Sequence, residues 1–263
     1  MVNILENVIL GIIQGLTEFI PISSSGHLVI AQNFFSGASN HLFLEFINIG
    51  TVLALLVYFR RRIIDIINDI FVRKKYKLAV NILITAIPAG IIGFLLAGFI
   101  ESSSFFGSLV VVAITLGVVG VVMVLLERFP KASTIPDSES LSNSRALLIG
   151  LAQVLALIPG VSRSGSTIIA SRLAGLNASS AAEYSFLASI PIMLGLTLKS
   201  LMNDQAYLAD NLFTLIIGNS VAFIAGMLAI GFLMKYLSGH SLALFGWYRI
   251  VLATILAIVL LVQ

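Results

Sequence analysis

The sequence predicts an all-α polytopic membrane protein, with six spanning helices, two re-entrant helical hairpins and two inverted-topology repeats. The first observation behind this prediction is composition, since 59% of the residues are hydrophobic and only 10% are charged. A soluble domain carries roughly a quarter charged residues, so this chain has too little polar material to cover a water-facing surface. The second is a series of long apolar runs, and the third is a polar motif that occurs twice within them.

Six apolar runs reach the roughly 20 residues that a helix needs to cross a bilayer. They cover 42–59, 78–99, 105–126, 181–201, 211–234 and 241–262. Two further segments, 4–35 and 146–176, are interrupted midway by proline, glycine and serine. Because non-helical backbone survives at membrane depth only next to protein or water, we expect both to be re-entrant hairpins.

The distribution of charge predicts the orientation in a cytoplasmic membrane. Seven of the fifteen lysines and arginines lie in 60–77, which places that loop in the cytoplasm. Counting crossings from there puts 127–145 in the cytoplasm as well and 202–210 outside. The basic residues therefore belong to a membrane-facing loop, and we expect no nucleic-acid partner.

The sequence lacks two features, cysteine residues and the pattern of a signal peptide. The chain has no cysteine, which excludes disulfides and thiolate metal sites. The N-terminal region lacks the basic start and small-residue cleavage site of a signal peptide, so we expect residues 1–22 to remain in the protein.

An internal repeat relates the two interrupted segments. Residues 10–31 align without gaps on 149–170, at an offset of 139, with eight identities in 22 positions. Three crossings separate the copies, and an odd number inverts the second relative to the first. We therefore expect a single membrane domain, 1–263, with repeats at approximately 4–126 and 146–262 joined by loop 127–145, and a site near the midplane where the broken segments meet.

The second copy, "LIPGVSRSGSTII" (157–169), has the features of a phosphate cradle. Arg163 presents a fork of donors that suits phosphate oxygens, and a glycine-containing turn that opens a helix points backbone N–H groups at an anion. The hydroxyls and glycine beside it are Ser162, Ser164, Gly165, Ser166 and Thr167. An arginine at membrane depth costs about 2.5–3.5 kcal/mol on insertion scales, which an anionic ligand would offset.

The first copy, "QGLTEFIPISSSGHLVI" (14–30), supplies reactive groups. Gln14 and Glu18 share one helix face, His27 can transfer protons or orient a serine, and a hydroxyl beside it can act as a nucleophile. Ser24 stands opposite Arg163 in the repeat alignment. Glu18 could hold a divalent cation, as could Glu45 or Glu183, although the latter two could equally form a structural pair.

These motifs resemble a known family. "QGLTEFIPISSSGH" and "PGVSRSGST" are similar to the two signature segments of the undecaprenyl-diphosphate phosphatases of the bacitracin-resistance type, and "EYSFLASIP" and "WYR" resemble lesser segments. The resemblance covers about residues 8–250. It implies removal of the terminal phosphate of the C55 polyprenyl diphosphate released in cell-wall synthesis, at a site that needs a divalent cation, Mg²⁺ or Ca²⁺, and opens to the outer face of the membrane.

We expect Glu18, Ser24, His27 and Arg163 to be catalytic, with Glu18 also a metal ligand. The diphosphate is expected to contact Gln14, Ser23, Ser25, Gly26, Ser162, Ser164, Gly165 and Thr167. The nucleophile is either Ser24 or a water activated by Glu18, and the sequence does not choose between them. The oligomeric state is also open, a homodimer included.

The alternative function is transport. Inverted repeats with re-entrant hairpins are typical of transporters, and an arginine–serine cradle binds phosphate without cleaving it, as in a polyprenyl-phosphate flippase or a secondary phosphate transporter. The unequal division of groups favours the enzyme: the acid and histidine lie in one copy and the arginine in the other, as in-line chemistry on phosphorus requires.

Overall fold

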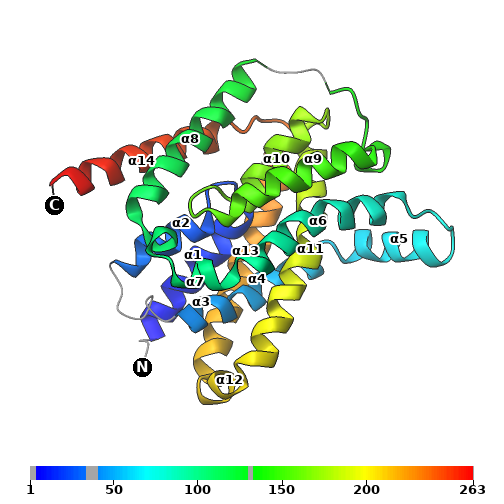
Figure 1. The fold of residues 1–263 in the computed structure, drawn as a ribbon. Coiled ribbons are helices and arrows are strands. Elements are labelled where there is room, and N and C mark those ends of the chain that lie inside the picture. Colours follow the sequence, from blue (N-terminus) through cyan, green and yellow to red (C-terminus); the bar gives the residue numbers. More distant parts are fainter. Residues whose placement is uncertain (1–3, 34–40, 130–132, 263) are drawn as a thin grey trace.

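A computed structural model of the chain describes residues 4–33, 41–129 and 133–262 (Figure 1). Every regular element in these ranges is a helix, as predicted. Residues 34–35 of the first predicted hairpin and 130–132 of the predicted cytoplasmic loop lie outside the described residues.

Six helices of the described chain are long and apolar enough to cross a membrane, which confirms a multi-pass membrane protein. They are α3 with α4 (His41–Phe46 and Asn48–Tyr58), α6 (Lys77–Leu95), α8 (Leu109–Arg128), α11 (Ala178–Asn203), α13 (Leu212–Leu237) and α14 (Ala243–Val262). Shorter helices join them: α5 (Arg60–Phe71), α7 (Ala97–Ser102) and α12 (Gln205–Asp210).

Two span ends lie four residues from their predicted positions, further than any other, and a helix cap explains the second of them. The predicted span 78–99 ends at Leu95 and continues as the separate short helix α7. The next span begins at Leu109 rather than at 105, because the hydroxyl of Ser108 accepts a hydrogen bond from the N–H of Val111 (3.4 Å) and caps the helix there.

The basic segment that follows α4 is a helix, α5, and not the loop that its charge suggested. Its isoleucines recur at helical spacing, and Ile63 and Ile66 pack against the main hydrophobic cluster. Arg62 also binds Glu183 at the start of α11 (3.1 Å) and Glu139 (3.0 Å), so this helix is fixed to the bundle.

Both interrupted segments consist of two helices joined by a short turn. The first is α1 (Ile4–Phe19) followed by α2 (Ser24–Gln32). The second is α9 (Asn143–Val154) and a 3₁₀ turn, then α10 (Arg163–Leu173). The breaks fall at the proline–glycine–serine clusters where the sequence predicted them.

The helices pack in pairs that connect distant parts of the chain (Figure 1). α1 and α4 pack on α13, α9 and α11 pack on α6, and α8 packs along α14. At the last crossing a glycine is required on each helix. A Cβ added at Gly120 would lie 2.8 Å from the carbonyl oxygen of Gly246, and one added at Gly246 would lie 2.8 Å from that of Gly120.

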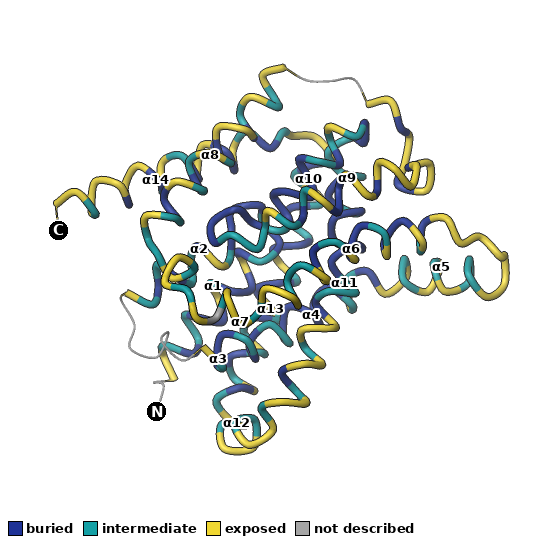
Figure 2. The backbone as a smooth tube through the Cα atoms, in the orientation of Figure 1, coloured by how far each residue is buried: buried dark blue, intermediate teal, exposed yellow. Residues whose placement is uncertain are grey.

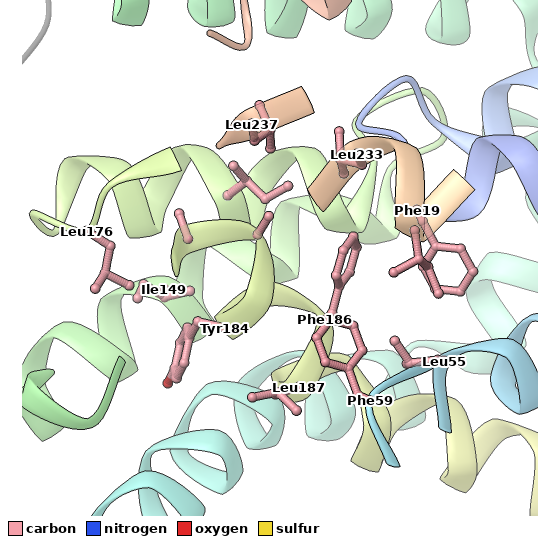
Figure 3. Close-up of a cluster of buried hydrophobic side chains, with 14 of the residues drawn as sticks. Phe19, Leu55, Phe59, Ile149, Leu176, Tyr184, Phe186, Leu187, Leu233 and Leu237 are labelled. Carbon is pink, nitrogen blue, oxygen red and sulfur yellow. The ribbon is translucent and has the colours of Figure 1, made fainter. Parts of the chain in front are cut away.

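Buried residues concentrate at the centre of the molecule, around α1, α10 and α11, while the outer faces of the spanning helices expose leucine, isoleucine, valine and phenylalanine as lipid-facing helices do (Figure 2). The main cluster packs Phe186 of α11 against Phe19 and Phe59, with ring centroids 5.6 and 5.9 Å apart (Figure 3). Because Phe19 directly follows Glu18, this core fixes the end of α1 that carries the acid.

Candidate active site

Two serine turns begin the helices that carry the candidate site. Ser23 precedes α2 with φ of 77° and Ser162 precedes α10 with φ of 76°. They are two of the three non-glycine residues with positive φ in the described chain. Such backbone costs about 1–3 kcal/mol and persists mainly at functional positions.

The two turns also make the same hydrogen bonds. The Ser23 hydroxyl accepts from the N–H of Gly26 (3.2 Å) and lies 3.2 Å from the Ser25 hydroxyl. In the second turn the Ser162 hydroxyl accepts from the N–H of Gly165 (3.1 Å) and lies 3.2 Å from that of Ser164. The serine and glycine pairs that matched in sequence therefore have equivalent structural roles, as N-terminal caps.

Glu18 joins the two copies. Its Oε1 accepts a hydrogen bond from Arg163 Nη2 at 2.7 Å, and its Oε2 accepts one from Ser24 Oγ at 2.6 Å. Gln14 Nε2 donates to the same Oε2 at 3.1 Å and to Asn48 Oδ1 at 2.5 Å. The acid, the hydroxyl and the cation expected from three separate stretches thus form one contiguous cluster.

The Glu18–Arg163 ion pair is mostly withdrawn from solvent. Its side chains are 13% and 19% exposed. An ion pair in such surroundings is costly to desolvate and contributes little to stability by itself. Removing one partner leaves an uncompensated charge, so any ligand that displaces Glu18 from Arg163 has to be anionic itself.

This cluster lies at the wall of a cavity of about 360 Å³. Six of the predicted site residues line it: Gln14, Glu18, Ser24, Ser25, Ser162 and Arg163. Glu45 also lines the cavity and accepts a hydrogen bond from Ser200 (3.0 Å), whereas its repeat counterpart Glu183 binds Arg62 elsewhere.

The remaining predicted contacts are structural neighbours of the cavity and do not line it. Ser23, Gly26, Ser164 and Gly165 form the caps described above. Thr167 Oγ1 bonds the carbonyl oxygen of Arg163 (2.8 Å) and the Ser185 hydroxyl (2.5 Å), so it supports α10 from behind.

Both ring nitrogens of His27 bond groups other than the Glu18 carboxylate. One ring nitrogen lies 2.7 Å from the carbonyl oxygen of Ser23 and the other 2.8 Å from the Tyr248 hydroxyl. The imidazole also stacks on the Tyr248 ring, with centroids 5.8 Å apart. In this arrangement the imidazole is bonded to the first serine turn, and the choice between its two expected roles stays a prediction.

Sequence reasoning missed two contributors. Asn48 was overlooked because a single amide within an apolar span carries little signal. Arg249 is fully buried, and its guanidinium donates to the carbonyl oxygens of Pro21 (3.1 Å), Val161 (3.1 Å) and Gly160. One side chain from α14 therefore ties both serine turns together.

The donor set allows one test of the expected divalent cation. The described residues contain no group of three or more acidic or histidine side chains that could hold a metal alone. Mg²⁺ usually needs only one or two carboxylates together with substrate phosphates and water. Glu18 and Glu45 line one cavity with the side-chain carbonyls of Gln14 and Asn48, so the residues present fit such a cation.

Comparison with known proteins shows which family the chain resembles. The family described as bacitracin resistance protein BacA matches residues 7–255. The chain is 41% identical to a protein named undecaprenyl-diphosphatase 1 from Clostridioides difficile, over 97% of this chain and 95% of that one. It is 36% identical to undecaprenyl-diphosphatase 2 of Paramagnetospirillum magneticum, over 98% and 100% of the two chains. The chain belongs to the BacA bacitracin-resistance family.

Proposed function

We propose that the protein hydrolyses undecaprenyl diphosphate to the lipid monophosphate and inorganic phosphate, which recycles the lipid carrier of cell-wall synthesis. The observation that carries this proposal is the position of Glu18 between the Ser24 hydroxyl and the Arg163 guanidinium. The names of the relatives support the same substrate.

Arg163 binds the diphosphate in this account. Its guanidinium offers planar donors, and the N-terminus of α10 adds backbone N–H groups and a favourable dipole. When the phosphates enter the cavity, they compete with Glu18 for the arginine. Glu18 is thereby released to act on Ser24, which couples substrate binding to activation of the nucleophile.

Ser24 then attacks the terminal phosphorus. Its proton passes to Glu18 Oε2, the Oγ–P bond forms, and the bond from phosphorus to the bridging oxygen breaks, so that the lipid monophosphate leaves with that oxygen. Water next attacks the phosphoserine, so that a new P–O bond forms and the P–Oγ bond breaks; Glu18 returns its proton to Ser24 Oγ, and the proton of the water leaves with inorganic phosphate. Attack by a Glu18-activated water in a single step is the competing route.

A divalent cation, Mg²⁺ or Ca²⁺, is part of the proposal. Glu18 would hold it, with Glu45 as a second carboxylate of the same cavity. When bound, the cation neutralises charge on the phosphate oxygens.

We also infer that the two broken segments are re-entrant hairpins of inverted repeats, 4–126 and 146–262. The matching serine caps support this inference. The packing supports it as well, because the first helix of each repeat packs on a helix of the other repeat: α1 packs on α13, and α9 packs on α6. At the repeat offset, α6 corresponds to most of α13. Inverted broken helices typically place a site near the midplane.

The orientation follows from the basic residues of α5, which put 60–77 and 127–145 in the cytoplasm and the cavity on the outer side. Glu45 and Ser200, at the cavity, then lie toward the outer ends of their helices.

A homodimer stays a prediction. The comparisons lend no support to the transport alternative, since the relatives reported are named as diphosphatases.

Phosphate release from undecaprenyl diphosphate by purified protein tests the proposal. We expect release that EDTA abolishes and added Mg²⁺ or Ca²⁺ restores. Glu18→Gln and Arg163→Ala should each lower kcat/KM by about 10²–10³-fold, the usual cost of a general base or a charge-stabilising donor. Thr197→Ala, which also lines the cavity, is the matched control. No release by folded wild-type protein would overturn the proposal.

A further inference from the structure

A second cavity, of about 740 Å³, adjoins the candidate active site between α6 and α11. On each of the two helices, four lining residues follow one another at steps of four, three and four positions. This spacing places the four residues of each helix on a single helix face. Among the lining residues, the positions with this spacing are Leu83, Ile87, Gly90 and Phe94 of α6, and Pro191, Gly195, Leu198 and Met202 of α11. We call this cavity the α6–α11 groove.

The groove is continuous with the polar cavity. Both are lined by Glu45, Ala89, Leu157, Ile192, Leu196 and Lys199. Charged side chains thus occur where the groove meets the polar cavity, and the rest of the wall is aliphatic apart from Phe94 and His41. A polar pocket that continues into an apolar groove has the shape of an amphiphile with a charged head and a hydrocarbon chain.

The two helices are fixed together at one end and line the groove beyond it. The Tyr184 hydroxyl, early in α11, lies 2.7 Å from Thr85 Oγ1 and donates to the carbonyl oxygen of Asn81 (3.0 Å), early in α6. The groove residues follow in the later part of each helix. In the inferred orientation, this part lies toward the outer leaflet.

Two glycines keep the groove wide. A Cβ added at Gly90 or at Gly195 would meet no atom within 4 Å, and both residues are exposed. A larger side chain at either position would therefore project into the groove without displacing backbone. This differs from the glycines of the helix crossings, where an added Cβ would strike a neighbouring helix.

We infer that the α6–α11 groove binds the first isoprene units of the lipid diphosphate, with Gly90 and Gly195 as the residues that determine access for the chain. The inference rests on the proposed function, since it is the diphosphate in the polar cavity that directs the chain into the groove. A cavity of about 740 Å³ falls within the usual size of small-molecule sites, about 300–1,000 Å³. It therefore holds only the near part of a C55 chain, and the remainder extends into the bilayer.

Filling the groove should separate long-chain from short-chain substrates. We would compare kcat/KM of wild type, Gly90→Leu and Gly195→Leu on undecaprenyl diphosphate and on methyl diphosphate, which carries no isoprene unit. In both variants the long-chain value should fall by about tenfold or more, equivalent to about 1.4 kcal/mol, while the short-chain value stays within about twofold of wild type. The matched control is Gly98→Leu, an exposed helical glycine with an equally open surrounding that does not line the groove.

An unchanged long-chain value, or an equal fall on both substrates, would overturn the inference. A second measurement needs no variant: undecaprenyl diphosphate with a diazirine on its first isoprene unit is photolysed with the wild-type protein. Label within 77–95 and 178–203 supports the groove, whereas label confined to α8 and α14 contradicts it. If wild type releases no phosphate from either substrate yet labels in the groove, the proposed function fails and the binding site stands.

Discussion

Glu18 has different partners on its two carboxylate oxygens, and the proposed chemistry depends on this division. Oε2 accepts a hydrogen bond from the Ser24 hydroxyl and is therefore placed to accept its proton, while Oε1 is bound by the Arg163 guanidinium. Gln14 holds the carboxylate in place, because its amide donates one hydrogen bond to Glu18 and another to Asn48. In the proposed mechanism, this single side chain both responds to the bound substrate and activates the nucleophile.

Arg249 is predicted to be a positioning residue for both serine turns. Arg249→Met leaves the carbonyl oxygens of Pro21, Gly160 and Val161 without this donor, and a buried unsatisfied polar group costs about 1–3 kcal/mol. We expect a lower melting temperature in detergent and a lower kcat, with partial recovery in Arg249→Lys because an ammonium restores some donors without the planar fork. The exposed Arg145→Met is the control, and an Arg249→Met protein with wild-type melting and kcat would contradict this role.

The contacts of His27 predict a role in orientation rather than in proton transfer. Tyr248→Phe keeps the stacked ring and removes the hydroxyl that lies 2.8 Å from the imidazole. We expect a loss of phosphate release below about tenfold and a pH–rate profile of unchanged shape, since a proton-transfer group near neutrality would shift one limb of the profile. A displaced limb in this variant would show that His27 moves protons.

Among the helices, the crossing of α8 and α14 matters most for the site because it positions Arg249. Gly120→Val should destabilise the protein, since the new Cβ would lie 2.8 Å from the carbonyl oxygen of Gly246 and 2.9 Å from Ile250 Cγ1. Overpacking of this kind costs typically about 1–3 kcal/mol. Gly117→Val, on the same helix, is the control because its Cβ would meet only Ala253 Cβ at 3.5 Å. Equal melting temperatures for the two variants would contradict a tight crossing.

The topology of the whole molecule can be tested directly because the chain contains no cysteine. Single cysteines at two exposed positions, Arg73→Cys after α5 and Gln205→Cys in α12, should lie on opposite sides of the membrane. An impermeant maleimide should label position 205 in intact cells and position 73 only after permeabilisation. Labelling of both from one side would refute the inferred orientation and the repeats built on it.

The sequence predicts much of this architecture because its strongest signals are local. Hydropathy predicts the six spans, and the proline–glycine–serine clusters predict where the broken segments turn. The gapless repeat also predicts that Ser24 and Arg163 occupy corresponding positions near one another, and both contact Glu18.

What the sequence could not predict depends on contacts between distant helices. The three carbonyl partners of Arg249 come from two separate turns. No sequence pattern predicts a buried arginine whose partners are backbone carbonyl oxygens. The orientation of His27 depends on Tyr248, more than 200 residues away. Likewise, the α6–α11 groove exists only once two apolar faces have been placed against each other.

The central claim is that Glu18 activates the hydroxyl of Ser24 for attack on phosphorus, and one comparison tests it most directly. Phosphate release from undecaprenyl diphosphate would be measured for Ser24→Ala and Ser25→Ala, two adjacent serines of the same cavity, of which only Ser24 is hydrogen-bonded to Glu18. We predict that Ser24→Ala loses about 10³-fold or more in kcat while Ser25→Ala stays within about tenfold of wild type. A Ser24→Ala protein that keeps most of its kcat would contradict the account and leave a Glu18-activated water as the nucleophile.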